Sequence, residues 1–218
     1  MILRRPGQQR FAVCDGASTS YDGGGWAFAL ARQYLLDNDL RSDWLARVRH
    51  CYADRRRPAD ADWLGVLAFE RGSFATFLGV SIGEERIVVH AIGDSVLFVV
   101  APDAPVRMEP ALSPTEFAAR PTLLCSAPGI GAFADDDAAF DAARTIIPRP
   151  EGGWQGTRLL AVTDALAAWI VAREDESLAR ISELEGIAGA PAFRDWCARA
   201  IAERRVRYDD CAMLAVTL

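Results

Sequence analysis

The chain has 218 residues, 51% hydrophobic and 25% charged, with a formal net charge of −6 at pH 7, which indicates a soluble globular protein of one sizeable domain or at most two small ones. The negative charge argues against a nucleic-acid partner, and without a bilayer-length apolar run or a signal peptide at residues 1–10 we expect a cytoplasmic protein with no membrane partner. All 24 basic residues are arginines, which excludes lysine chemistry, and with only His50 and His90 available a metal site must be built mainly from carboxylates, which prefer Mg²⁺ or Mn²⁺.

The first informative segment is FAVCDGASTSYDGGGWAFALA, residues 11–31. Its apolar start predicts a strand at 11–13 that ends on Asp15 and Gly16, and a helix over about 25–36 follows the glycine-rich turn. A second helix is expected over 42–52. The carboxylate at the strand end either turns the chain or faces a positively charged group.

The middle of the chain changes to a strand pattern. Residues 73–82, 86–101 and 106–110 predict successive strands with short turns at 83–85 and 93–95, and such short links require antiparallel pairing. A polar stretch over 113–137 follows, and we expect the three aspartates at its end, 135–137, to lie in a solvated loop.

The last third repeats the order of the first segment. An apolar strand at 159–163 leads into Asp164, where a helix begins, and two more helices are expected over 175–184 and 192–204. Asp209 and Asp210 then form a turn into a final strand. Adjacent strands with helices between the groups indicate an α+β sandwich.

Three aspartates therefore mark strand ends: Asp15 and Asp164 follow strands, and Asp209 precedes one. In an antiparallel sheet the end of an outgoing strand and the start of an incoming one lie at the same edge, so the three carboxylates could meet. Carboxylates that converge repel one another unless cations hold them, and a divalent metal cluster would do so. Each aspartate taken singly is more typical of a helix cap or a turn.

Four motifs in this order, DGAS with GGGWA, AIGDSVLFVV, LLAVTDALAAW and DDCAMLAVTL, resemble the metal-dependent protein phosphatases of type 2C, in the bacterial branch whose first motif reads Asp-Gly-Ala. The resemblance covers residues 11–218. It implies a single domain over 1–218, with a four-layer αββα sandwich of two antiparallel sheets flanked by helices. It also implies hydrolysis of phosphoserine and phosphothreonine in proteins, with a phosphorylated protein and a cognate kinase as partners.

The resemblance further implies a role for each aspartate. Asp15 would bridge two Mn²⁺ or Mg²⁺ ions, the Gly16 carbonyl would bind one of them, and Asp164 and Asp209 would hold the other. A water shared by two such ions is the nucleophile in two-metal hydrolysis. This agrees with five singly spread cysteines, which form no CxxC pattern, and with the lack of a Cys or Ser nucleophile beside a histidine base.

The sequence also departs from the family pattern. Members carry an arginine strand and an Asn-Glu-Asp segment before the first motif, whereas residues 1–10 contain no acid. The second metal site is then left with Asp15 and Gly16, and we expect the N-terminal strand to be missing and one sheet edge to be open, where a second copy of the chain could pair. Three functions stay open: a weakly active protein phosphatase, a pseudophosphatase that acts as a regulatory binding module, or a metal-dependent hydrolase of small phosphoesters with the same site.

Two further residues have competing interpretations. Asp94 in the GDS sequence is either a hairpin turn residue or a weak ligand of a third metal ion, and Ala165 and Ala168 stand where many family members have Gly and Asp, which removes one such ligand. His90 is expected to be a core histidine rather than a general acid.

Overall fold

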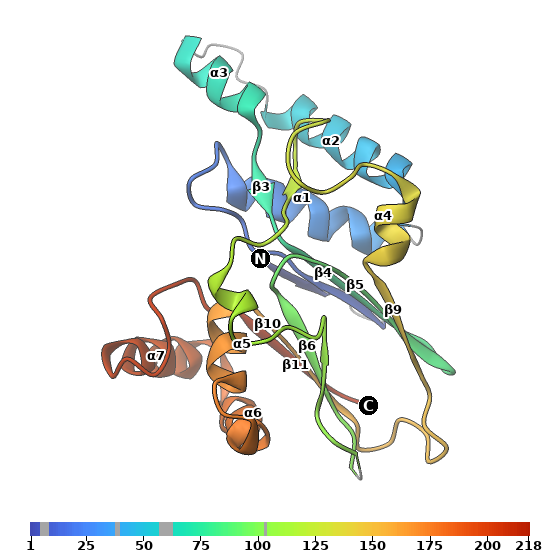
Figure 1. Cartoon of the computed structure of the whole chain (residues 1–218), viewed down its shortest axis with the longest axis vertical. Helices are drawn as coiled ribbons and strands as arrows, with labels where there is room; N and C mark the ends of the chain where they lie inside the picture. The colour runs from blue at the N-terminus through green and yellow to red at the C-terminus, as the bar shows by residue number, and fades with distance from the viewer. Residues whose placement is uncertain (5–8, 38–39, 57–62, 103) are drawn as a thin grey trace. The chain divides into compact units, whose positions relative to one another are not determined.

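The computed structural model describes residues 1–4, 9–37, 40–56, 63–102 and 104–218 (Figure 1). The chain divides into two compact units, each with a sheet of its own. Unit 1 comprises Met1–Ser95 and Pro121–Arg149, and unit 2 comprises Val96–Arg120 and Pro150–Leu218. Among the helices of the described residues, none is long and apolar enough to cross a membrane.

The main sheet of unit 1 has five strands in the order β1-β2-β4-β5-β9, and every neighbouring pair is antiparallel. A two-stranded antiparallel sheet joins β3 (Phe74–Ala75) to β8 (Leu124–Cys125). The five strands of the main sheet are β1 (Ile2–Arg4), β2 (Arg10–Val13), β4 (Phe77–Ile82), β5 (Arg86–Ile92) and β9 (Arg144–Pro148).

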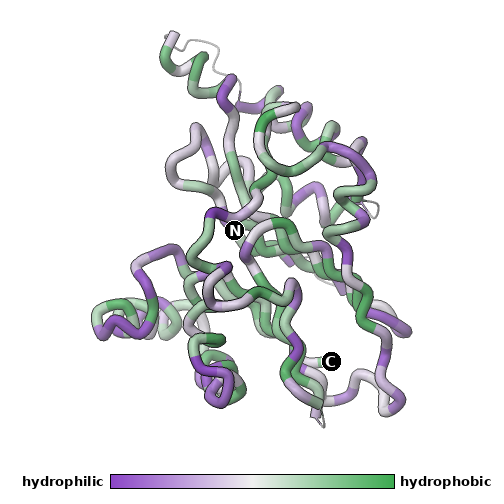
Figure 2. Tube along the Cα trace, in the orientation of Figure 1, coloured by the Kyte–Doolittle hydropathy of each residue, from purple (hydrophilic) through white to green (hydrophobic). Residues whose placement is uncertain are grey.

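In unit 1, α1 packs against the main sheet through an apolar face. Trp26, Leu30 and Tyr34 of this helix are at most 1% exposed, at the spacing of one helical face. Figure 1 shows α1 and α2 side by side, and Figure 2 shows the strands beneath them as predominantly hydrophobic. The helices that the described residues of this unit form are α1 (Gly23–Leu36), α2 (Ser42–Arg56), α3 (Trp63–Arg71) and α4 (Asp137–Ala142).

Unit 2 has a four-stranded antiparallel sheet in the order β11-β10-β6-β7. Its core forms where Leu160 and Val162 of β10 pack with Leu166 and Ile170 of α5, all of them fully buried. The strands are β6 (Val96–Val100), β7 (Arg107–Glu109), β10 (Arg158–Val162) and β11 (Met213–Thr217), and the helices are α5 (Asp164–Val171), α6 (Ser177–Glu185) and α7 (Gly189–Ala202), with 3₁₀ turns at Glu116–Ala118 and Glu174–Glu176.

The predicted fold class, α+β with antiparallel sheets and helices, is confirmed. The predicted helices over 25–36, 42–52, 175–184 and 192–204 are present, with ends shifted by up to four residues. The packing of the two sheets into one four-layer domain stays a prediction.

One strand pairing was predicted wrongly. β5 and β6 are separated only by Gly93, Asp94 and Ser95, yet they belong to different sheets and do not form a hairpin. Gly93 has φ +106°, and an added Cβ would lie 2.8 Å from the side chain of Thr76. Only glycine fits such a backbone easily, so this residue lets the chain leave one sheet for the other.

A strand precedes β2, although the sequence led us to expect none there, and the loss of the family's N-terminal arginine strand stays a prediction. Residues 2–4 form β1, which pairs with β2 in register from Ile2 opposite Val13 to Arg4 opposite Phe11. The edge of β2 is therefore paired within the chain, and the three-residue strand β1 is the edge strand on this side. A dimer through a sheet edge stays a prediction.

The three aspartates at 135–137 are exposed, as predicted, and Asp135 and Asp136 lie in the loop before α4, but all three also bind protein groups. Asp135 accepts hydrogen bonds from both terminal nitrogen atoms of Arg49, at 2.7 and 3.0 Å. Asp136 caps the N-terminus of α4, and Asp137 accepts from the backbone N–H and the hydroxyl of Ser42, at 2.9 and 2.8 Å. Each carboxylate thus fixes α4 or its preceding loop, because each satisfies a donor that would otherwise need water.

Candidate functional site

Asp164 is placed by the junction of β10 and α5 in unit 2. Thr163 is the N-cap of α5, and Asp164 is the first residue of the helix, where a negative charge is favoured by the helix dipole. The residue is only 8% exposed, and Oδ1 accepts a hydrogen bond from the N–H of Ala165 at 2.6 Å. A buried carboxylate at this position needs a positive partner for its other oxygen.

The hydroxyl of Thr163 brings the segment before β11 to the same place. It donates to the carbonyl oxygen of Asp210 and accepts from the N–H of Ala212, both at 3.0 Å, while the N–H of Thr163 donates to the Ala212 carbonyl at 3.1 Å. These three bonds hold the turn that carries Asp209 next to the start of α5. The predicted pair Asp164 and Asp209 therefore lies at one end of the sheet of unit 2.

Both carboxylates contact the same cation, the guanidinium of Arg207. Its Nη2 forms an ion pair with Oδ2 of Asp164, and its Nε lies 3.5 Å from Oδ2 of Asp209. Its Nη1 donates to the carbonyl oxygen of Phe117 at 3.0 Å. One arginine thus uses all three nitrogen atoms in this site, and it offsets the repulsion between two carboxylates.

Two aspartates that share one cation form an oxygen donor set of the kind that Mg²⁺ and Mn²⁺ prefer. The donor chemistry of Asp164 and Asp209 therefore fits a divalent ion, although in the structure their common partner is Arg207. Within the parts of the chain that the structure describes, no three His, Cys, Asp or Glu side chains group closely enough to hold a metal.

Asp15 lies in unit 1, two residues beyond β2, and its backbone is fixed on both sides. Its N–H donates to Oγ1 of Thr76 at 2.9 Å, and its carbonyl oxygen accepts from the N–H of Thr76 at 2.8 Å. The Thr76 hydroxyl in turn lies 2.9 Å from that of Ser95. The half-buried carboxylate of Asp15 is therefore presented from a rigid strand end. Its approach to Asp164 and Asp209 stays a prediction.

Gly16 has a packing reason to be glycine. An added Cβ would lie 2.3 Å from the backbone carbon and oxygen of Gly23, at the start of α1. The strand end and the helix start touch through bare backbone, so any side chain here would push them apart. A role of the Gly16 carbonyl toward a metal ion stays a prediction.

Asp94 is 7% exposed and lies where the chain passes from the sheet of unit 1 to the sheet of unit 2. The hairpin-turn interpretation of this residue is therefore wrong, and the third-metal interpretation stays a prediction. His90 is half-buried on β5 rather than in the core.

The cysteines near the predicted site are poor nucleophiles. Burial raises the pKa of Cys14 to about 12, and burial next to Cys197 raises the pKa of Cys211 to about 12. At neutral pH both stay thiols, and the thiolate is the reactive form. All five cysteines are free.

The functional residue that sequence reasoning missed is Arg207. The available signal was an arginine two positions before Asp209 in a turn that leads into a strand, in a chain whose cations are all arginines. Its partner Asp164 is distant in sequence, so nothing local indicated the contact.

No protein family model matches this chain, and no curated protein matches it. Several solved structures do. PppA, a key regulatory component of T6SS in Pseudomonas aeruginosa, gives a TM-score of 0.55 at 12% identity over 100% of this chain and 90% of its own. The catalytic domain of the serine threonine protein phosphatase PstP, in complex with two manganese ions, gives 0.54 at 15% identity over 98% and 92%. Serine/threonine phosphatase Stp1 from Staphylococcus aureus gives 0.58 at 12% over 100% and 87%.

The chain has a type 2C phosphatase-like fold. This is the fold that the four motifs led us to expect, and the match extends over almost the whole length of the solved phosphatases. At these identities the likeness concerns the fold alone. Arg207 and its two carboxylates are features of this chain itself.

Proposed function

We propose that this chain is a metal-dependent phosphoserine/phosphothreonine protein phosphatase of low basal activity, acting in the cytoplasm on a phosphorylated protein. The observation that carries the proposal is the convergence of Asp164 and Asp209 on one cation within a type 2C phosphatase-like fold.

In this proposal Asp164 and Asp209 hold one Mn²⁺ or Mg²⁺ ion, and Asp15 and the Gly16 carbonyl are the ligands expected for the second. A bound divalent ion supplies a water of lowered pKa and charge for the phosphoryl oxygens. The chain contributes orientation: the Thr163 hydroxyl fixes the turn that carries Asp209, and the N–H of Ala165 fixes one oxygen of Asp164.

Arg207 accounts for the low activity. While its guanidinium contacts both carboxylates, a divalent ion must displace it, so the ion binds more weakly by the free energy of those contacts. The side chain of Arg207 is 39% exposed, so its guanidinium can rotate away from the two carboxylates into solvent.

The second candidate is the pseudophosphatase, a regulatory module that binds a phosphorylated protein without hydrolysing it. It is favoured by the same arginine: if Arg207 never leaves, the pair of carboxylates is permanently neutralised and serves only to hold β11 to α5. Removal of Arg207 separates the two candidates, because it should raise activity in a phosphatase and leave a pseudophosphatase inert.

The test is a Mn²⁺ titration of phosphatase activity on a phosphothreonine peptide. We expect slow hydrolysis by the wild type that requires millimolar Mn²⁺ and stops with EDTA, and a rise of about tenfold at low Mn²⁺ for Arg207→Met, since Met keeps the aliphatic stem without the charge. Arg205→Met is the matched control, because Arg205 lies in the same loop but pairs with Glu183 and Glu203.

Asp164→Asn should remove the phosphatase activity both from the wild type and from Arg207→Met. If wild type and Arg207→Met are equally inert at saturating Mn²⁺ while the phosphopeptide still binds, the phosphatase proposal is wrong and the binding module replaces it.

A further inference from the structure

Unit 1 contains a cavity of about 480 Å³ at the end of its main sheet that lies away from Asp15. β2 has Arg10 at its start, which lines the cavity, whereas Asp15 follows the other end of the strand. The volume lies within the range of sites that bind small molecules. We call it the arginine pocket.

Strand register builds the floor of this pocket. Arg10 pairs with Ser81, Ser81 pairs with Val88, and His90 pairs with Arg144. Residues directly opposite one another on neighbouring strands point to the same face, and so do residues two apart on one strand. All five line the pocket, so its floor is one sheet face that carries polar and basic side chains.

Tyr34 of α1 forms the deep wall. It is 1% exposed, and its ring lies over Gly79 of β4, where an added Cβ would come within 2.8 Å of the ring. The guanidinium of Arg10 stacks 4.5 Å from the centre of the Tyr34 ring. Burial raises the pKa of Tyr34 to about 12 against the opposing charge of Arg10, so the hydroxyl keeps its proton as a donor. Within the described residues that buried hydroxyl has no hydrogen-bond partner of normal geometry.

The charge of the pocket is strongly positive. Four arginines line it, Arg10, Arg41, Arg86 and Arg144, against a single acid, Asp141. Arginines packed around one cavity repel one another, and the repulsion is strongest where water is excluded. Arg41, Arg86 and Arg144 are exposed, so water weakens this repulsion, and the surplus of positive charge still favours an anion.

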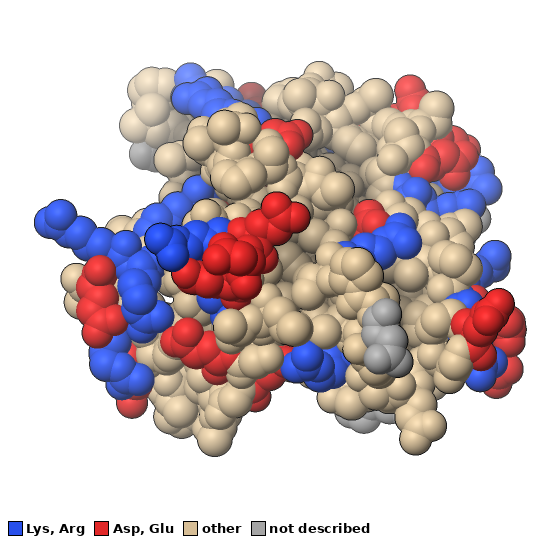
Figure 3. Space-filling view, turned by 60° about the horizontal axis from the view of Figure 1, so that its bottom comes forward, with Lys and Arg blue, Asp and Glu red and all other residues tan. Residues whose placement is uncertain are grey.

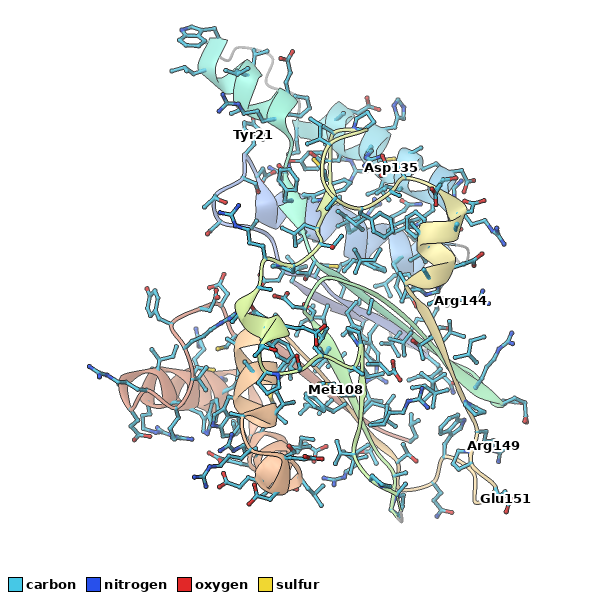
Figure 4. All side chains as sticks on the ribbon, viewed as in Figure 1. Tyr21, Met108, Asp135, Arg144, Arg149 and Glu151 are labelled. Carbon is cyan, nitrogen blue, oxygen red and sulfur yellow. The ribbon has the colours of Figure 1, made fainter. Side chains whose placement is uncertain are left out.

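Two of the four arginines are held by the protein, and two are not. Arg10 donates to the carbonyl oxygen of Asp37 at 2.8 Å, and Arg41 lies 3.5 Å from a carboxylate oxygen of Asp137. By contrast, the side chains of Arg86 and Arg144 make no hydrogen bond or ion pair within the described part of the chain. Figure 4 labels Arg144 at the start of β9, next to α4.

We propose that the arginine pocket binds a small molecule that carries a phosphate or pyrophosphate group. Arg86 and Arg144 contact its oxygens, because a guanidinium offers paired donors that match phosphate geometry. The buried hydroxyl of Tyr34 gives a further donor, and the apolar side chain of Val88 contacts the rest of the ligand. The site does not depend on the metal or on Asp164, so it stands or falls separately from the proposed activity.

The test is calorimetric titration of the full chain with inorganic pyrophosphate and inorganic phosphate, in EDTA so that no metal-held anion contributes. We expect pyrophosphate to bind, and the double variant Arg86→Ala/Arg144→Ala to lose at least tenfold in affinity at an unchanged melting temperature. Arg149→Ala is the matched control, because Arg149 follows the same strand but lies outside the pocket and pairs with Glu85 at 3.4 Å.

Several results would overturn the proposal. The proposal is wrong if the wild type does not bind pyrophosphate or if the double variant binds it as tightly as the wild type. It is also wrong if Arg149→Ala lowers the affinity for pyrophosphate as much as the double variant does. Equal affinity for citrate, a tricarboxylate of similar charge, would overturn the assignment to phosphate chemistry. Loss of phosphatase activity in Asp164→Asn with pyrophosphate binding retained would separate the two sites and support the proposal.

Discussion

Arg207 in unit 2 contacts two carboxylates and a carbonyl oxygen, whereas Arg86 and Arg144 in unit 1 line a cavity without a hydrogen bond or ion pair among the described residues. The chain has 24 arginines against 30 acids, and on the face in Figure 3 basic and acidic side chains lie close together. Because acidic residues outnumber arginines, a group of arginines without carboxylate partners is unexpected and points to a role for their charge. In our proposals, the compensated arginine competes with a metal ion for two carboxylates, and the uncompensated ones receive an anion.

The largest stability effect should come from breaking the compensated pair. Arg207→Ala leaves the carboxylate of Asp164, whose side chain is 12% exposed, without its cation, and we expect a loss of about 1–3 kcal/mol in the free energy of unfolding. The partial exposure of Arg207 keeps the value below that of a fully buried pair. Urea unfolding at low salt and pH 7 measures it.

Arg144→Ala is the matched comparison for that experiment. With no partner to lose, it should change the free energy of unfolding by less than about 0.5 kcal/mol, with a gain at low salt because one like charge is removed. Equal losses in the two variants would remove the distinction between compensated and uncompensated arginines.

A smaller loss of stability is expected when the pair between Arg49 and Asp135 is broken. Arg49 is a compensated arginine in the same unit as the arginine pocket. Burial opposes ionisation of Asp135, but the two hydrogen bonds from Arg49 and the N–H of Gly129 outweigh it and lower the pKa of Asp135. A carboxyl whose pKa is lower in the folded protein stabilises it above about pH 4 and loses this effect as the pH falls through the folded pKa. Asp135→Asn should therefore cost about 1 kcal/mol at pH 7 and progressively less below pH 4.

Thermal unfolding across pH 3–7 measures the difference. Asp136→Asn is the neighbouring control, since Asn caps a helix as well as Asp does and should leave stability nearly unchanged. A loss for Asp135→Asn that is the same at pH 3 as at pH 7 would rule out the electrostatic explanation.

The sequence was sufficient where one local pattern determines the element. The helix α1 and the β10–α5 junction were predicted because an apolar run meets a helix start at a glycine-rich turn or at Asp164. The helix α3 was not predicted although its sequence is apolar. It has no buried face, with Trp63 and Leu64 72% and 54% exposed, so its apolar residues do not follow the spacing of an amphipathic helix.

Pairings that depend on distant residues were not predictable in this way. The strands β1 and β9 are short, and both are defined by the partner strand rather than by their own pattern. The passage from β5 to β6 looks like a tight hairpin, and only the two different partner strands show that it is not one. Arg207 and the arginine pocket likewise depend on contacts made after folding.

The most direct test of the central claim, that Arg207 holds Asp164 and Asp209 in the place of a divalent ion, is calorimetric titration of Mn²⁺ into wild type, Arg207→Met and Arg205→Met. We predict that Arg207→Met binds Mn²⁺ at least tenfold more tightly than wild type, because two carboxylates that have lost their cation gain the most from a new one. Arg205→Met should match wild type. Equal Mn²⁺ affinity in all three proteins, or weaker binding in Arg207→Met, would contradict the claim.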